Sequence, residues 1–378
     1  MDFGFSEEQE MLRKSTRDFL AKECPISYVR RMMDDDIGHS EDVWRKMAEL
    51  GWMGLIFPDS VGGAGLDMVD LVIVLEEMGR VVLPGPFFAT VVLGGITIAE
   101  AGSEQQKTRY LEKIAAGEMK ATLAVLEASG RSDADAIEAT ATADSGGYLL
   151  DGTKLFVPDA HVADLVIVAA RKEGTKGADG ISLFAVETPK DGVTVTTLAT
   201  MDQTRKLCEV KLDKVRVGPE ALVGKAGDGW KTLQRVTDGA KVALCAEMCG
   251  GAERVLEMSV EYAKVRVQFD RPIGSFQAIQ HKCANMLLLV ESSKSATYYA
   301  AWAVANDVPE APLAAAMAKS YTSDAYRVVV GDGIQIHGGI GFTWEHDMHL
   351  YFKRAKGSEF MFGDATFNRE RVAQLMDV

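Results

Sequence analysis

The chain has 378 residues, of which 47% are hydrophobic and 25% charged, an ordinary globular composition for two or three domains. Its formal net charge of −14 disfavours nucleic acid and anionic membranes as partners, because both bind basic surfaces. The N-terminus lacks the pattern of a signal peptide, and no run of about 18 apolar residues could span a bilayer. The five cysteines include no CxxC pair, so we expect a cytoplasmic protein without structural disulfides.

Residues 1–120 have the apolar periodicity of helices. Ser6 and Gln9 have the spacing of a capping box, which predicts that a helix starts directly after Ser6. Gly51 follows another amphipathic stretch and is a favourable residue at a helix C-terminus. The stretch 68–79 is apolar nearly all round, which is typical of a buried central helix. We expect an N-terminal helical domain over these 120 residues.

Residues 121–228 follow a different pattern, with about seven short stretches rich in β-branched residues. Turn signals such as Asp151-Gly152 separate these stretches, and no helical pattern lies between them. Strands without intervening helices predict an antiparallel sheet domain, either a barrel or a sandwich.

Residues 229–378 return to the helical period. A long first helix is interrupted only by Gly239, Gly250 and Gly251, and two prolines near residue 310 separate two later helices. The order along the chain is therefore helices, strands and helices.

The segment QIHGGIGFTWEHD places Gln335 and the pair Gly338-Gly339 at the end of an apolar helix. Bare backbone lets a phosphate or ribose approach closely, and the glutamine can both donate and accept hydrogen bonds. A plain glycine-capped helix end is the alternative interpretation. We interpret the following acidic and histidine residues as structural rather than as a metal site.

The segment YAKVRVQFDRPIGSFQAIQHK arranges Arg266, Phe269 and Gln277 around a tight turn between two long helices. Arginine can bind a phosphate through two hydrogen bonds, and phenylalanine can cover an aromatic ring. A surface arginine beside an ordinary interhelical turn is the alternative.

The segment EFMFGDATFNRER near the C-terminus combines polar and aromatic residues around one glycine. Asp364 directly follows Gly363, where a catalytic carboxylate would be natural. Phe362 precedes this glycine and cannot carry a proton. The segment predicts either the catalytic end of an enzyme or a site that has lost its base.

In order and motifs the whole chain resembles the acyl-CoA dehydrogenase family. The segments that carry the resemblance are YAKVRVQFDRPIGSFQ, QIHGGIGFTWEHDMHLYFKRA and YLLDGTKLFVPDAHVAD. The resemblance implies an α+β multidomain fold: an N-terminal α-helical domain, a middle antiparallel β domain and a C-terminal four-helix bundle domain. We place these domains at residues 1–120, 121–228 and 229–378.

The resemblance also implies a bound FAD and an acyl-CoA substrate. Arg266 and Phe269 would contact the diphosphate and adenine side of the FAD, and Gln277 would contact the flavin nucleotide. The residues that would reach the dinucleotide of a neighbouring subunit are Gln335, Gly338 and Gly339. A homotetramer or an α2β2 heterotetramer would follow, with electron-transferring flavoprotein as the electron acceptor.

The middle domain departs from the family pattern where it would meet the flavin ring. Leu126 stands in place of the usual threonine, and Phe156 and Pro158 replace a tryptophan and a threonine. Flavin contacts there must run through backbone or packing. The resemblance assigns Ser132 to the thioester side, and Lys241 and Phe362 also to the substrate.

The family reaction removes an α-proton from an acyl thioester and passes a β-hydride to flavin N5. It needs a carboxylate base and hydrogen-bond donors for the developing enolate. Aligning FNR of this chain with IQR of the family puts Phe362 on the usual glutamate, and leaves the backbone N–H of that residue as a donor. The base position of a minority of members falls at about Ala240, which is not acidic either.

Three interpretations remain open. In the first, Asp364 or Asp238 is the base of a self-sufficient dehydrogenase. In the second, this chain is the base-deficient, flavin-binding subunit of a heteromeric dehydrogenase and completes the site of a catalytic partner. A non-enzymatic flavin-binding scaffold is a variant of this second interpretation. In the third, the chain is a flavoprotein of the same fold that works in another direction or on another substrate, such as an enoyl-CoA reductase. The acyl group stays open in all three.

Overall fold

A computed structural model describes residues 4–378, which form two compact units. We call them the helical unit and the sheet unit and describe each by itself. Of the described residues, the helical unit comprises 4–31, 67–83 and 241–378, and the sheet unit comprises Met32–Leu66 and Pro84–Ala240. The division into three domains after residues 120 and 228 stays a prediction, because the units combine segments from more than one expected domain.

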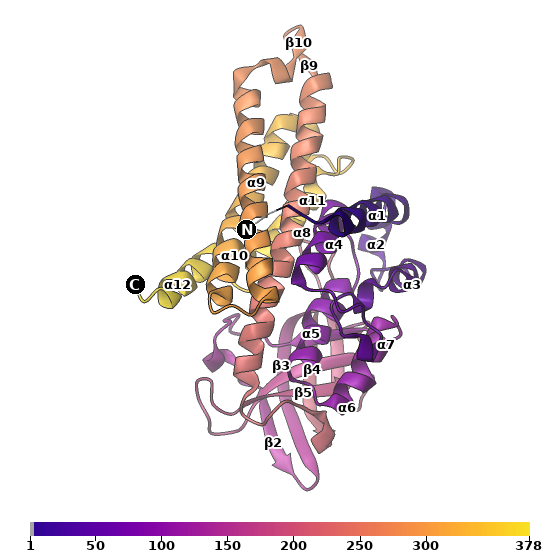
Figure 1. Cartoon of the computed structure of the whole chain (residues 1–378), viewed down its shortest axis with the longest axis vertical. Helices are drawn as coiled ribbons and strands as arrows, with labels where there is room; N and C mark the ends of the chain where they lie inside the picture. Colours follow the sequence, from indigo (N-terminus) through magenta and orange to yellow (C-terminus); the bar gives the residue numbers. More distant parts are fainter. Residues whose placement is uncertain (1–3) are drawn as a thin grey trace. The chain divides into compact units, whose positions relative to one another are not determined.

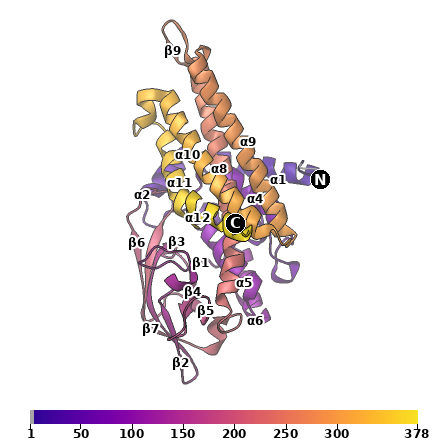
Figure 2. The same cartoon turned by 90° about the vertical axis from the view of Figure 1, so that its left-hand side faces the viewer.

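The helical unit is built mainly from long helices. They are α1 (Glu7–Glu23), α2 (Ile26–Asp34), α4 (Met68–Arg80), α8 (Gly229–Val265), α9 (Gln277–Ala305), α10 (Ala311–His337), α11 (Met348–Phe360) and α12 (Ala365–Leu375). Helices α2 and α8 continue past the boundaries of this unit. Helices α9 and α10 lie side by side, and α11 and α12 pack against α10 (Figures 1 and 2).

The glycines of α8 mark close approaches rather than breaks. The helix is continuous from Gly229 to Val265, so the interruptions expected at its glycines do not occur. A Cβ atom on Gly250 would collide with the carbonyl oxygen of Glu76 in α4, and one on Gly251 would collide with the hydroxyl of Tyr326 in α10. Glycine therefore allows α4 and α10 to pack directly on α8.

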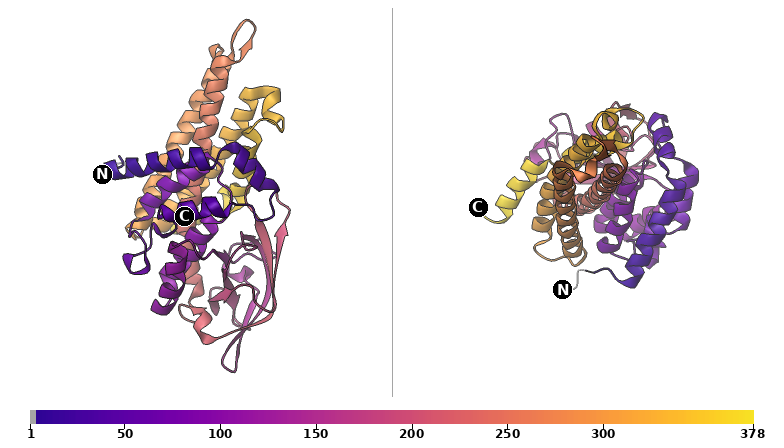
Figure 3. Two further views of the ribbon diagram at one scale, coloured as in Figure 1. Left: turned by 90° about the vertical axis from the view of Figure 1, so that its right-hand side faces the viewer. Right: turned by 90° about the horizontal axis from the view of Figure 1, so that it is seen from above.

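Helix α4 is buried although two of its acidic residues, Glu76 and Glu77, are each only 1% exposed. Arg17 of α1 pairs with Glu77 at 2.7 Å, and Lys294 of α9 pairs with Glu76 at 3.2 Å. Buried carboxylates need such partners, so these pairs tie α1 and α9 to α4. Figure 3 shows α1, in indigo, beside the helices of this unit.

Eight strands form one sheet in the order β6-β7-β3-β2-β4-β5-β8, with β1 paired to β4. They are β1 (Ala121–Ala124), β2 (Thr140–Asp144), β3 (Gly147–Pro158), β4 (Leu165–Arg171), β5 (Ile181–Glu187), β6 (Val193–Leu198), β7 (Leu207–Val217) and β8 (Leu222–Val223). Strand pairs such as β2–β3, β4–β5 and β6–β7 are antiparallel as expected, whereas β1 runs parallel to β4. A hairpin turn before β1 would have predicted an antiparallel neighbour. Strand β1 follows a helical segment instead, so its sequence did not predict whether it pairs parallel or antiparallel.

Shorter helices complete the sheet unit. They are α3 (Glu41–Glu49), α5 (Ile96–Ala101), α6 (Glu104–Gln106) and α7 (Glu112–Ala115), with π-helical segments η3 (Phe88–Gly95) and η4 (Lys107–Leu111). Segment η3 packs against β1.

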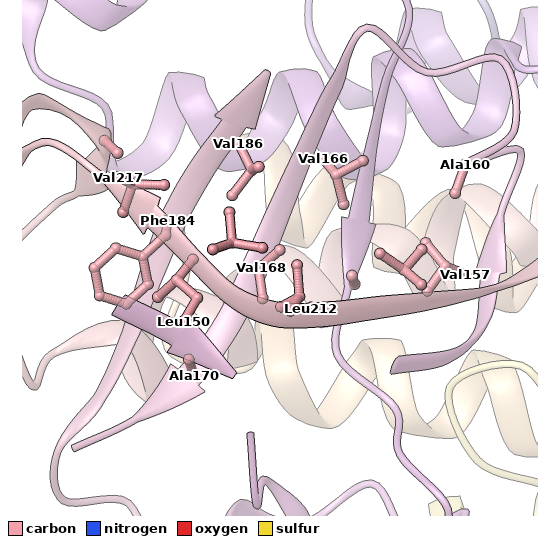
Figure 4. Packing of buried hydrophobic residues seen from close by; sticks show 14 of the residues in the cluster. Leu150, Val157, Ala160, Val166, Val168, Ala170, Phe184, Val186, Leu212 and Val217 are labelled. Carbon is pink, nitrogen blue, oxygen red and sulfur yellow. The ribbon is translucent and has the colours of Figure 1, made fainter. Parts of the chain in front are cut away.

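The core of the sheet unit consists of side chains that alternate toward one face of the sheet. In β4 these are Val166, Val168 and Ala170, and in β5 they are Phe184 and Val186. Figure 4 shows them meeting core side chains from β3 and β7. Each of the five is at most 1% exposed. Burial of apolar surface stabilises the folded state by about 25 cal/mol per Å², so these side chains stabilise the sheet.

Candidate functional site

The segment YAKVRVQFDRPIGSFQAIQHK, which we call the arginine motif, contains a hairpin with a two-residue turn just beyond the end of α8 (Figure 1). Strand β9 (Val267–Gln268) pairs with β10 (Arg271–Pro272), and the turn consists of Phe269 and Asp270. Both turn residues have positive φ angles, 54° and 60°. A residue other than glycine adopts this conformation at a cost of about 1–3 kcal/mol. The turn leaves the Phe269 side chain 86% exposed.

The segment QIHGGIGFTWEHD, which we call the glycine motif, starts at the end of α10, and its Gly338 has a φ angle of 63°. A Cβ atom on Gly338 or Gly339 would meet nothing within 4 Å, so the backbone is open at both positions. The ring of His337 stacks on Tyr262 of α8 at a centroid distance of 4.5 Å. Since Tyr262 lies about one turn before Arg266, the structure brings the arginine and glycine motifs together.

Exposed groups of these two motifs fit a dinucleotide. Arg266, Gln277 and Gln335 are all exposed, as is the ring of Phe269. A guanidinium binds phosphate, amide groups donate and accept hydrogen bonds, and an aromatic face covers a flat ring system. Together with open glycine backbone, these are groups that can hold FAD.

In the sheet unit, the structure brings Leu126 and Phe156 together. The N–H of Leu155 donates to the carbonyl oxygen of Leu126 at 2.8 Å. Strand β3 has an irregular register between Lys154 and Val157, and Phe156 within it has a φ angle of 54°. This bulge leaves the Phe156 ring 48% exposed. The pair thus combines an apolar side chain with an outward aromatic ring.

A buried ion pair supports this bulge. Lys154 is 0% exposed, and its Nζ donates to the Glu127 carboxylate at 2.6 Å. The same carboxylate accepts the N–H groups of Glu138 and Ala139, the closest contacts being 3.0 Å. Burial lowers the pKa of Lys154, and the contact with Glu127 opposes this shift. The pair fixes the strand that precedes Phe156 to the segment that follows Leu126.

The turn between α11 and α12 contains Phe362, Gly363 and Asp364. Phe362 and Gly363 have φ angles of 57° and 84°, so two successive residues are left-handed. Asp364 is the N-cap of α12, and its carboxylate accepts the N–H of Phe367 at 2.8 Å. An aspartate in this role stabilises the helix start by about 1 kcal/mol. The carboxylate nearest to the expected base position is therefore engaged as a helix cap.

Lys319 of α10 binds this turn from within the helical unit. The lysine is 0% exposed, and its Nζ donates to the carbonyl oxygens of Glu359 at 3.1 Å and Gly363 at 3.0 Å. The third hydrogen bond goes to Oγ of Ser323 at 2.8 Å. These three acceptors match the three donors of an ammonium group. Burial lowers the pKa of Lys319 to about 8, because desolvation disfavours the charge.

Asn368 of α12 binds the same turn and is also 0% exposed. Its Nδ2 donates to the carbonyl oxygens of Phe362 at 3.3 Å, Gly363 at 3.0 Å and Asp364 at 3.0 Å. The carbonyl oxygen of Gly363 thus accepts from both buried side chains. We call Lys319 and Asn368 the carbonyl clamp.

Of the remaining expected residues, Lys241 lies near Lys319, because its positive charge contributes to the lowered pKa of that lysine. Ser132 is half-buried in a loop of the sheet unit, between Arg131 and Asp133, which pair at 2.8 Å. Asp238 and Lys241 both lie on α8, the first half-buried and the second 4% exposed. Asp238 belongs to the sheet unit, whereas Lys241 and Asp364 belong to the helical unit.

The carbonyl clamp and the pair of Glu127 with Lys154 were not predicted from the sequence. A charge at a core-facing position was the available signal. Lys319 stands in the alanine-rich stretch AAAMAKSYTSDA on a buried helix face, and Lys154 occupies an inward position of a strand. Asn368 gave no such signal, since it is uncharged and its acceptors are backbone carbonyls.

Two other kinds of site have no counterpart in residues 4–378. Groups of three or more His, Cys, Asp or Glu side chains placed to hold a metal ion are absent from this part of the chain. Its helices are also too short or too polar to cross a bilayer.

The sequence matches three family domains in chain order. They are the acyl-CoA dehydrogenase N-terminal domain over residues 6–118, the middle domain over residues 122–215 and the C-terminal domain over residues 227–376. The chain belongs to the acyl-CoA dehydrogenase family, whose members are oxidoreductases. The expected family and fold class are therefore confirmed.

Individual relatives point to more than one role within this family. Acyl-CoA dehydrogenase IpdE2 of Mycobacterium tuberculosis is 36% identical over 356 residues, which cover 93% of this chain and 92% of the relative. The 3-(aryl)acrylate reductase of Clostridium sporogenes is 31% identical over 356 residues, 92% of this chain and 93% of that protein. A chain of the ChsE4–ChsE5 complex from Mycobacterium tuberculosis superposes with a TM-score of 0.90 and 29% identity, covering 100% of this chain and 99% of that one.

Proposed function

We propose that this chain binds FAD and an acyl-CoA thioester and acts as the subunit without a catalytic base in a heteromeric acyl-CoA dehydrogenase. The observation that carries the proposal is the turn between α11 and α12. In the alignment of FNR with the family's IQR, Phe362 falls on the position of the family base. The nearest carboxylate along the chain, that of Asp364, caps α12 and accepts the N–H of Phe367 at 2.8 Å. The relative ChsE4–ChsE5 supports it as a family member described as a complex of two chains.

When bound, FAD supplies the acceptor for the hydride that leaves Cβ of the acyl group. We assign its diphosphate and adenine to Arg266 and Phe269, and its flavin nucleotide to Gln277. Leu126 and Phe156 would contact the flavin ring by packing and backbone rather than by a hydroxyl. The residues assigned to the dinucleotide of a neighbouring subunit are Gln335, Gly338 and Gly339. The thioester and its acyl group are assigned to Ser132, Lys241 and Phe362.

The base is the group that this chain lacks. Proton transfer from the α-carbon needs a carboxylate within hydrogen-bond reach, and a phenylalanine ring cannot accept a proton. Redirecting the Asp364 carboxylate toward a substrate would remove the N-cap of α12. A related chain with a glutamate at the position of Phe362 supplies the base in an α2β2 assembly, and electron-transferring flavoprotein accepts the electrons.

Reduction of an enoyl-CoA is the second candidate. A relative at 31% identity is a 3-(aryl)acrylate reductase, which adds hydrogen across a double bond rather than removing it. The same FAD and thioester groups would serve this direction.

The test uses the purified chain alone. Its flavin spectrum is recorded, and a panel of acyl-CoA esters is then added without oxygen. The proposal expects bound FAD that is not bleached by any ester, and bleaching once a related, glutamate-bearing chain is co-expressed. Bleaching of the chain alone would overturn the base-deficient assignment. In that case Asp364→Asn and Asp238→Asn identify the base, since loss of the base slows bleaching and loss of the other residue does not.

A further inference from the structure

The turn between α11 and α12 keeps a strained backbone although it carries no base. Phe362 is left-handed, with a φ angle of 57°. Such a conformation persists only where the surrounding structure holds it. The carbonyl clamp provides that support, because Lys319 and Asn368 are both fully buried and direct their donors into this turn.

The clamp fixes the direction of the amide groups as well as that of the carbonyls. In a trans peptide unit, C=O and the next N–H point in opposite directions. The carbonyl of Phe362 faces Asn368, so the N–H of Gly363 faces away from Asn368. The carbonyl of Gly363 faces Asn368 and Lys319, so the N–H of Asp364 faces away from both. The turn therefore presents its acceptors to the clamp and these donors to the other side.

We propose that Lys319 and Asn368 are positioning residues that aim the N–H groups of Gly363 and Asp364 at the carbonyl oxygen of a bound acyl thioester. This inference deepens the proposed function and rests on it for the identity of the ligand. A set of outward donors suits an oxygen that gains negative charge when the α-proton leaves. The buried ammonium of Lys319 polarises the peptide unit whose carbonyl it binds, which makes the opposite N–H a stronger donor.

The loss of the base at residue 362 leaves this arrangement intact. A glutamate or a phenylalanine side chain can project from the same left-handed residue, while the clamp acts only on backbone carbonyls. The turn can thus bind and polarise a thioester even in a chain that does not remove the proton.

The experiment compares two clamp variants with exposed controls, all carrying FAD. Asn368→Leu removes one clamp residue, and Lys319→Gln is the milder change that keeps two amide donors. Asn285→Leu and Lys113→Gln make similar changes at exposed positions. Amide deuterium exchange is measured for the peptide spanning residues 359–366. Infrared spectra are recorded for butyryl-, octanoyl- and cinnamoyl-CoA, each labelled with ¹³C at the thioester carbonyl.

The proposal expects exchange in the turn to speed up at least tenfold in both clamp variants and in neither control. It also expects the labelled carbonyl band to shift to lower wavenumber on binding to the wild-type chain, and to lose at least half of that shift in the clamp variants at unchanged FAD content. Unchanged amide exchange in the clamp variants would show that Lys319 and Asn368 do not hold the turn. Faster exchange with an unchanged carbonyl band overturns the positioning role, because a purely structural clamp would give that result. If none of the three esters binds the wild-type chain, the thioester role fails together with that part of the proposed function, and exchange alone decides whether the clamp exists.

Discussion

Two turns of the helical unit hold a phenylalanine in the left-handed conformation, yet they are supported in opposite ways. Phe269 is 86% exposed, and its ring meets Phe276 edge-on at 6.1 Å. Phe362 is half-buried, and the carbonyl clamp binds its turn from within the unit. Backbone strain therefore marks two kinds of site in this unit. At the hairpin a ligand would cover the strained residue, whereas at the second turn the protein fixes the backbone before any ligand binds.

Loss of the clamp should give the largest effect on stability. Asn368→Leu leaves three backbone carbonyls without the amide that donates to them, so we expect the free energy of unfolding to fall by about 3 kcal/mol. Urea unfolding of the variant and of Asn285→Leu measures this directly. A fall of less than about 0.5 kcal/mol, equal to that of the exposed control, would mean that the turn does not depend on the clamp.

The pH dependence of stability tests the buried charge of Lys319. Because its pKa is lowered to about 8 from 10.5, the unfolded chain binds more protons than the folded chain between these values. Stability contributed by this residue should therefore rise with pH, by about 2 kcal/mol between pH 7 and pH 9.5. Urea midpoints of the wild type and Lys319→Met over this range give the difference. Parallel curves for the two proteins would contradict a lowered pKa, and Lys113→Met serves as the exposed control.

At the exposed turn, the effect should fall on the cofactor rather than on stability. Phe269→Ala removes a ring that is 86% exposed, so we expect stability to change by less than about 0.5 kcal/mol. Loss of an aromatic contact should weaken FAD binding about tenfold. Titration of the apo chain with FAD, followed by flavin fluorescence, gives the dissociation constant. Equal FAD affinity in the wild type and the variant would contradict a role of the strained hairpin turn in binding FAD.

The smallest effect should come from Asp364→Asn. Asparagine is as good an N-cap as aspartate, so stability should change by less than about 0.5 kcal/mol. Asp364→Ala removes the cap and should cost about 1 kcal/mol. Thermal unfolding of the two variants compares these values. A large loss in Asp364→Asn would show that the charge, rather than the cap, is what the turn needs.

Local signals in the sequence predicted much of the fold. The capping box of Ser6 and Gln9 is present, and Gly51 follows the end of α3 with a φ angle of 76°. These features depend on neighbours within a few residues and can be read from spacing alone. The parallel partner of β1 lies on β4, about 44 residues later in the chain, and no local pattern encodes that pairing.

The residues of the candidate site also fall into those that a local motif predicts and those that depend on distant contacts. Arg266, Phe269 and Gly338 could be identified because each lies in a contiguous motif. Lys319 and Asn368 could not, since the lysine acts on a carbonyl 44 residues away and both recognise backbone rather than side chains. The role of Gly250 and Gly251 in α8 could not be predicted for a related reason, because it depends on packing against Glu76 and Tyr326.

We propose that the clamped turn of this chain can bind a thioester and that the chain lacks the carboxylate base at residue 362. The most direct measurement is the anaerobic flavin spectrum of the wild-type chain and of Phe362→Glu after addition of an acyl-CoA panel. We predict no bleaching in the wild type and bleaching by at least one ester in Phe362→Glu, because the clamp would hold the new carboxylate at the same left-handed residue. Bleaching of the wild-type chain alone, or none in Phe362→Glu, would contradict the claim.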